Sequence, residues 1–194
     1  MDTAVARERA LDAAGALFYA RGIQSVGMDE IRGACGLSLK RLYGLFPGKE
    51  DLVDAYLERR DTEWRGRLAE HVEGCAAPRE RLLAVFDHLH AWFAEPDFRG
   101  CAWINSYGEL GTSWPRVAER ARAHKSAFRE YLGALVADAG LPAPLAGQLT
   151  LLAEGAMVTA GIFGTPEPAS QAREAAAVLV EAAGRPGGPC PEVS

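Results

Sequence analysis

A cluster of cationic and hydroxyl side chains lies early in the chain; its members are Ser38, Lys40, Arg41 and Tyr43. Lysine and arginine can donate hydrogen bonds to guanine O6 and N7 or to phosphate, and hydroxyl groups can hold phosphate oxygens. The cluster therefore has the chemistry of a contact with duplex nucleic acid. The alternative is a set of solvated surface charges beside a packing tyrosine.

The charge of the chain is unevenly distributed. Its 194 residues carry a formal net charge of −5, but residues 1–60 hold nine basic and nine acidic residues, so the acidic excess falls in the remainder. Between Ile31 and Lys49 there are four basic residues and no acidic one. A local basic patch on an acidic protein fits a small contact with a polyanion. We expect Arg32 and Lys49, the latter at a helix start, to add phosphate contacts.

Two short helices must position these side chains. The first is predicted from Met28 to Cys35 and the second over residues 39–46, with Ser38 as its N-cap and Gly36 in the turn between them. Apolar residues are available to pack the two helices together: Ile31, Leu37, Leu42 and Phe46. This layout is that of a helix-turn-helix, whose second helix presents its N-terminal half to the major groove.

The rest of the chain also reads as helix, and no stretch shows the alternation typical of a strand. The predicted helices are 3–20, 28–35, 39–46, 49–73, 78–94, 101–110, 115–139, 142–163 and 167–183. We therefore predict an all-α fold with a DNA-binding domain over residues 1–48, a larger helical domain over 49–184 and a disordered, Pro- and Gly-rich tail over 185–194.

The early segment resembles the N-terminal domain of TetR-type transcriptional regulators. The resemblance rests on an ordered set of short runs: 18–22 (FYARG), 28–31 (MDEI), 35–38 (CGLS), 42–43 (LY) and 46–52 (FPGKEDL). Val26 and Gly27 stand where the family often has two hydroxyl residues, so a phosphate-binding cap is missing there. Gly44 and Leu45 replace a common polar or aromatic pair.

The resemblance implies a homodimer whose subunits each have nine or ten helices, with three N-terminal helices on DNA and a C-terminal domain that binds a small ligand. It implies a regulator, most often a repressor, that binds a near-palindromic operator and is released by a small-molecule effector. The widely spaced cysteines and the absence of a secretory signal predict a cytoplasmic location. By position, the DNA contacts would be Ser38, Lys40, Arg41, Tyr43 and Lys49. Two alternatives remain: a helical adaptor that has lost DNA binding, and a small helical enzyme.

The C-terminal domain carries two weaker predictions. Its aromatic and polar side chains could build a ligand pocket, mostly apolar with a few polar anchors: Trp64, Phe86, His90, Phe93, Trp103, Asn105, Tyr107, Phe128, Tyr131, Glu154 and Met157. The alternative for each is an ordinary core position. Small and apolar residues at helical spacing predict a dimer interface: Leu149, Leu152, Ala156, Ala160, Ala172, Ala176 and Leu179. An internal core face is the alternative.

Other classes of protein find little support in the sequence. The four cysteines lie far apart and no two have a metal-ligand spacing, so we expect reduced thiols, with a redox role for Cys101 as the one open case. We expect no metal, no cofactor and no catalytic residue, because no nucleophile motif or phosphate loop is present. No apolar run is long enough to suggest a membrane span, and the charged N-terminus does not resemble a secretory signal.

Overall fold

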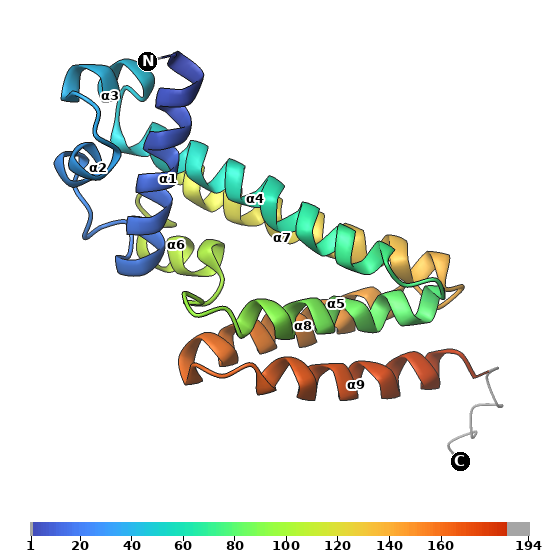
Figure 1. Ribbon diagram of the computed structural model, residues 1–194. Coiled ribbons are helices and arrows are strands. Elements are labelled where there is room, and N and C mark those ends of the chain that lie inside the picture. Colours follow the sequence, from blue (N-terminus) through green and yellow to red (C-terminus); the bar gives the residue numbers. More distant parts are fainter. Residues whose placement is uncertain (1, 186–194) are drawn as a thin grey trace. The chain divides into compact units, whose positions relative to one another are not determined.

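The computed structural model describes residues 2–185, and within that range it contains nine helices and no strand (Figure 1). The helices are α1 (Thr3–Arg21), α2 (Met28–Cys35), α3 (Leu39–Leu45), α4 (Lys49–Glu73), α5 (Pro78–Phe93), α6 (Ala102–Leu110), α7 (Pro115–Asp138), α8 (Pro144–Phe163) and α9 (Glu167–Ala183). The all-α prediction is confirmed, and the predicted helix ends agree to within two residues. Apart from Arg185, the predicted tail lies outside the described residues.

The chain forms two compact units. Of the described residues, unit 1 comprises 2–67 and 99–126, and unit 2 comprises 68–98 and 127–185. Unit 1 thus holds α1, α2, α3 and α6 with the first parts of α4 and α7, whereas unit 2 holds α5, α8 and α9 with the remaining parts of those two long helices.

In unit 1, α1, α2 and α3 pack against one another around a fully buried apolar core that includes Leu11, Ile31 and Leu42. The turn between α2 and α3 is made by Gly36, whose φ of 66° lies in the left-handed region that other residues enter at a cost. Ser38 then caps α3, because its Oγ accepts a hydrogen bond from the Arg41 amide at 3.2 Å. These two residues fix where α3 begins and hence which side chains it presents.

In unit 2, α5, α8 and α9 lie side by side (Figure 1). Alanines on the facing sides of α8 and α9, including Ala153, Ala160 and Ala176, are fully buried. Their small side chains let the two helix backbones approach closely. Helix α8 begins with Pro144 and ends at Gly164, which has a φ of 68°, so both of its ends are set by residues suited to those positions.

Helix α8 is also the one helix among the described residues that is long and apolar enough to cross a membrane. Core helices of soluble proteins meet the same criterion, and the helix carries a buried face of its own. Its composition is therefore weak evidence for a membrane span.

Candidate nucleic-acid interface and ligand cavity

Helix α3 exposes the side chains that the sequence marked for DNA contact. The side chain of Lys40 is exposed and makes no hydrogen bond or ion pair with any residue of the described range. Its ammonium group is therefore available to a polyanion. Tyr43 is 44% exposed although it is aromatic. Arg41 is exposed and donates a hydrogen bond from Nη2 to Thr3 Oγ1 at 2.9 Å. Ser38 is exposed as well, with its oxygen engaged in the cap.

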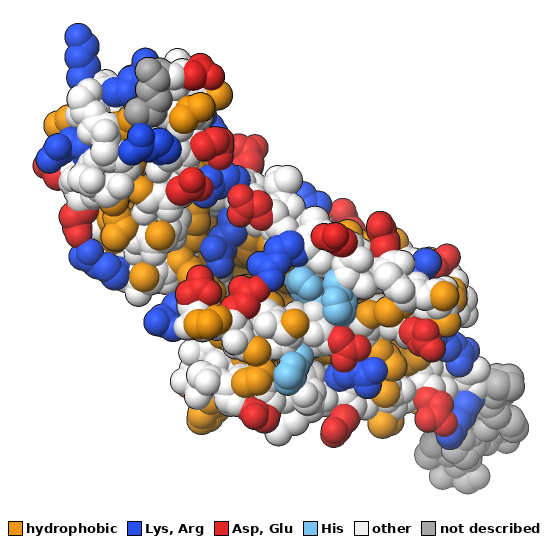
Figure 2. Space-filling view, viewed as in Figure 1, with side chains coloured by type: hydrophobic (Ala, Val, Ile, Leu, Met, Phe, Trp, Pro, Cys, Tyr) orange, Lys and Arg blue, Asp and Glu red, His pale blue; other side chains and the backbone are white. Residues whose placement is uncertain are grey.

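Helix α1 contributes residues near this surface that the sequence did not indicate. Thr3 holds the Arg41 guanidinium, as described. Arg7 lies over the ring of Phe46, with its guanidinium carbon 5.2 Å from the ring centroid. Arg9 lies beside the turn, since a Cβ added at Gly36 would come within 2.9 Å of its Nη2. Figure 2 shows basic side chains standing out among acidic ones on the visible face of unit 1. Helical spacing within α1 could not show that it passes next to α3.

The other two predicted phosphate contacts have different surroundings. Arg32 is exposed but pairs with Asp29 on its own helix at 3.3 Å. Lys49 is half-buried, and this partial burial lowers the pKa of its ammonium group while the Glu109 carboxylate opposes the shift. Gly27, at the N-cap of α2, offers no side chain, and the Glu30 carboxylate accepts from the Gly27 amide at 3.3 Å instead.

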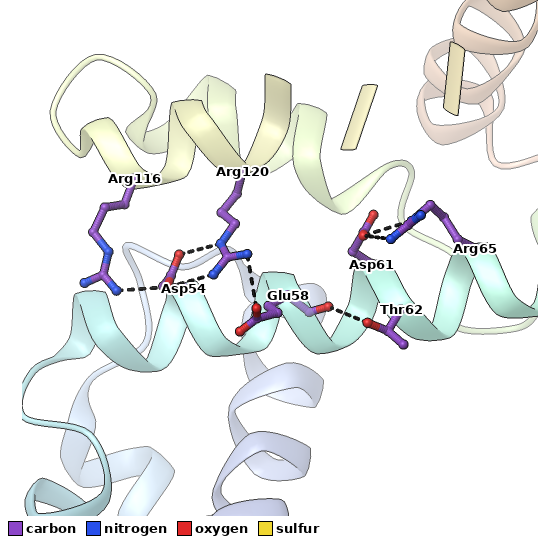
Figure 3. Close-up of polar contacts among 7 residues, drawn as sticks. All are labelled: Asp54, Glu58, Asp61, Thr62, Arg65, Arg116 and Arg120. Carbon is purple, nitrogen blue, oxygen red and sulfur yellow. Dashed lines mark hydrogen bonds and ion pairs between the residues drawn. The ribbon is translucent and has the colours of Figure 1, made fainter. Parts of the chain in front are cut away.

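Within unit 1, helix α7 is bound to helix α4 by a row of ion pairs (Figure 3). Arg116 reaches Asp51 at 2.8 Å and Asp54 at 2.9 Å. Arg120 binds the same Asp54 carboxylate at 2.7 Å and Glu58 at 3.4 Å. Asp54 is the most buried member, and its hydrogen bond from Arg120 lowers the pKa of its carboxyl group. The row ties the start of α7 to the helix that directly follows α3.

One turn further along, a histidine is buried between the same two helices. His124 is 3% exposed, its Nδ1 lies 2.6 Å from an oxygen of Asp61, and its ring stacks on Trp103 with a centroid separation of 3.4 Å. Burial lowers the pKa of His124 to about 4 and outweighs the opposing effect of Asp61. The ring is therefore neutral at pH 7 and donates from Nδ1 to the Asp61 carboxylate.

Helix α6 connects the interior of unit 1 to the loop before α2. The backbone N–H of Gln24 donates a hydrogen bond to Glu109 Oε2 at 3.0 Å, and the side-chain Nε2 of Gln24 donates one to the backbone oxygen of Glu109 at 2.6 Å. A cavity of about 330 Å³ lies beside this contact, with Tyr19, Tyr56 and Asn105 in its lining. A movement of α6 would therefore act directly on the segment that joins α1 and α2.

The comparisons with known proteins agree with this geometry. Residues 10–56 match the family described as bacterial regulatory proteins, tetR family. Residues 78–176 match the tetracyclin repressor-like C-terminal domain. The chain belongs to the TetR family. It is thus a transcriptional regulator with a DNA-binding domain, and its matched relatives are regulators rather than enzymes, as the sequence predicted.

Several TetR-family and other regulators resemble the chain closely. A TetR-family regulator from Streptomyces coelicolor has a TM-score of 0.85 at 28% identity, covering 94% of this chain and 97% of its own. An uncharacterized HTH-type regulator of Mycobacterium tuberculosis is 38% identical over 101 residues, or 47% of this chain and 50% of the relative. For the HTH-type regulator LmrA of Bacillus subtilis the identity is 32%, over 45% and 47% of the two chains. The chain thus spans about half the length of the curated relatives it matches.

The residues predicted for a ligand pocket divide between the two units of this TetR-family chain. Trp64, Trp103, Asn105 and Tyr107 belong to unit 1, and the others belong to unit 2. In unit 2, Phe86, Phe93, Phe128 and Met157 are buried, whereas His90 is exposed and the buried histidine of α5 is His88. Tyr131 and Glu154 are half-buried. In unit 1, Trp103 and Tyr107 line a cavity between α6 and α7, and Asn105 lines the cavity beside α1.

The predicted dimer interface of the TetR-family chain needs a correction. Five of its seven residues are less than 9% exposed in the single chain and have no surface to offer a partner: Leu149, Ala156, Ala160, Ala172 and Ala176. They form the internal core face that was the alternative. Leu152 and Leu179 are half-buried. The outward apolar side chains of the two helices are Leu151, Val158, Ile162, Phe163 and Val178.

Proposed function

We propose that this TetR-family chain is a ligand-responsive repressor that binds a near-palindromic operator as a homodimer and releases it when a small effector binds. The observation that carries the DNA-binding part is the exposure of Lys40, Arg41 and Tyr43 on one short helix of a helix-turn-helix. Polar and charged groups at the N-terminal half of such a helix are placed to contact base edges and phosphates.

The homodimer is supported by the outward apolar face of unit 2. Leu151, Ile162 and Phe163 are each at least 73% exposed, and Val178 of the neighbouring helix is 67% exposed. Such a concentration of exposed apolar side chains on adjacent helices marks an interaction surface, and a second copy of the same face would cover it about a two-fold axis. A two-fold dimer presents two α3 helices, as a near-palindromic operator requires, and successive major grooves on one side of the duplex are about 34 Å apart.

The effector response is supported by the contacts of α6 and α7 within unit 1. The Glu109 contact ties α6 to Gln24, next to α2, and the Arg116 and Arg120 ion pairs tie α7 to α4. A ligand that binds more tightly to one arrangement of these helices shifts the population toward it. If that arrangement is unsuited to the operator, the affinity for DNA falls by the same coupling free energy.

The DNA-binding part is tested by a mobility-shift assay on the DNA upstream of the protein's own gene. The double variant Lys40→Ala/Arg41→Ala should weaken binding at least about 100-fold, since each lost base or phosphate contact is worth about 1–3 kcal/mol. Arg129→Ala is the matched control, because Arg129 is an exposed arginine on α7 that belongs to unit 2 and not to the helix-turn-helix. Equal affinity of the double variant and the control would reject the assignment of α3.

A further inference from the structure

A cavity of about 280 Å³ lies between α6 and α7 in unit 1. Three residues of each helix line it: Trp103, Ile104 and Tyr107 from α6, and Ala121, Arg122 and Lys125 from α7. Of the described residues that line it, none is acidic and two are cationic. The chemistry of this lining differs from that of the cavity beside α1, which includes the Glu109 carboxylate.

The apolar wall of the cavity is flat and firmly supported. Trp103 is 1% exposed, and His124 stacks against its indole ring with an angle of 5° between the two planes. Because His124 is in turn held by Asp61, the indole is fixed from behind. Tyr107 is 49% exposed, so an aromatic side chain also stands at the open side of the cavity. Tyr107 and Ile104, backed by the buried indole of Trp103, suit a flat apolar molecule.

The two cations of the lining supply the polar anchor. The side chain of Arg122 is exposed and makes no hydrogen bond or ion pair with any residue between 2 and 185. Lys125 is half-buried and donates from Nζ to Cys101 Sγ at 3.3 Å. A carboxylate is a stronger acceptor for an ammonium group than a thiol is. Arginine additionally offers a planar pair of donors that matches a carboxylate.

We infer that this cavity binds a flat, apolar carboxylate, with its ring system against Tyr107 and Ile104 and its carboxylate at Arg122 and Lys125. The inference rests on the proposed function, since it names the chemical class of the effector. Bound there, the molecule would contact the same helix that holds Gln24 through Glu109. A neutral analogue would lose the charged hydrogen bonds, and a cationic analogue would in addition be repelled.

Isothermal titration calorimetry with three probes of one shape tests the inference on the full chain. The probes are 2-naphthoate, 2-naphthalenemethanol and 2-naphthylmethylamine, which are anionic, neutral and cationic at pH 7. We expect 2-naphthoate to bind at least about tenfold more tightly than the alcohol, because a hydrogen bond to a charged group is worth about 1.5–3 kcal/mol. The amine should bind more weakly than the alcohol.

Variants of the lining locate the binding site. Arg122→Gln should weaken binding of 2-naphthoate about tenfold and leave the alcohol unchanged, whereas Tyr107→Ala should weaken both. Arg129→Gln is the matched control and should leave all three affinities unchanged, because Arg129 is exposed on the same helix outside the lining. Equal binding of the three probes, no binding of any of them, or an Arg122→Gln variant with unchanged affinity would overturn the inference.

A mobility-shift assay in parallel separates this inference from the proposed function. If 2-naphthoate binds with the expected pattern and also lowers DNA affinity, both are supported. If it binds with that pattern while DNA affinity stays constant, the carboxylate site stands and the proposed effector response is contradicted. If DNA binding depends on Lys40 and Arg41 but the probes show no charge preference, the inference fails and the DNA-binding assignment stands.

Discussion

Helices α3 and α8 present their surfaces in opposite ways. On α3 the exposed side chains include a lysine, an arginine and a tyrosine, so the residues that face outward are also those with chemistry to offer. On α8 most residues are apolar, and apolar side chains occupy both the buried face and the exposed face. A polar function shows in the residue types themselves, whereas an apolar function shows only in the orientation of the helix.

Two leucines of α8 illustrate the difference. Leu149 is fully buried and Leu151 is 75% exposed, although they are the same residue type two positions apart. Helical periodicity identified a repeating apolar face correctly, but α8 is apolar on more than one face, and the one selected packs inside the protomer.

The largest expected effect comes from placing a charge on either face of α8. Ala160→Glu should lower the free energy of unfolding by about 4 kcal/mol or more, because Ala160 is fully buried and a carboxylate there would lose its hydration. Ile162→Glu, two positions away and 73% exposed, should change the free energy of unfolding of the monomer by less than about 0.5 kcal/mol, measured at protein concentrations below the dimer dissociation constant. Thermal and urea unfolding of the two variants measure the contrast.

Ile162→Glu should instead weaken self-association. A symmetric interface contains the substitution twice, and each buried isoleucine contributes about 1.5–3 kcal/mol, so the dimer dissociation constant should rise at least about 100-fold. Analytical ultracentrifugation measures it, with the exposed charge change Glu119→Gln on α7, in unit 1, as control. A stable dimer of Ile162→Glu would show that the interface lies elsewhere.

The next effect concerns the buried polar cluster of unit 1 and its dependence on pH. The pKa of His124 is about 4 in the folded chain against an ordinary 6.5, so the unfolded chain binds a proton that the folded chain does not. The free energy of unfolding should therefore fall as pH drops from about 6.5 to 4, by up to about 3 kcal/mol. Urea unfolding at several pH values should show a flatter profile for His124→Gln.

The part of this window above about pH 5 isolates the histidine from the carboxylates with lowered pKa values. Glu30, Asp54 and Asp61 lose their contributions only as pH falls from about 5 through their ordinary pKa values of 4.5 and 3.8. His124→Gln also keeps a side chain able to donate a hydrogen bond to Asp61. A wild-type profile that is already flat between pH 6.5 and 4 would show that His124 titrates normally.

The smallest effect compares two lysines of unit 1. Lys40→Ala should reduce the slope of log affinity for DNA against log salt concentration by about 1 for each subunit, as expected when a phosphate contact is lost. Lys49→Ala should change the slope less, since Lys49 is half-buried near Glu109. Filter binding across a salt series measures both slopes. A larger change of slope for Lys49→Ala than for Lys40→Ala would show that Lys49, and not Lys40, is the main phosphate contact.

Much of the fold could be predicted from the sequence because its helix ends depend on local residues. Gly36 and Ser38 fix the turn and the start of α3, and Pro144 and Gly164 are suited to the two ends of α8. The candidate DNA contacts follow from the same local signals. The matched families confirm the fold and the regulator class. The individual contact residues remain predictions.

The contacts that relate helices distant in the chain could not be predicted in this way. Arg120 meets Asp54, and Gln24 meets Glu109, across separations of 66 and 85 residues. Nothing in the spacing of either pair shows that the two residues are close. The cavity between α6 and α7 depends on the same distant packing, so the sequence could propose Trp103 and Tyr107 as pocket residues but could not assign Arg122 to them.

The position of Trp103 gives the protein a built-in optical reporter. Its buried indole belongs to the lining of the cavity between α6 and α7 and stacks on an imidazole ring. Indole emission responds to the polarity and charge of its surroundings, so the difference in emission between the wild-type chain and Trp103→Phe can report occupancy of the cavity without an attached dye.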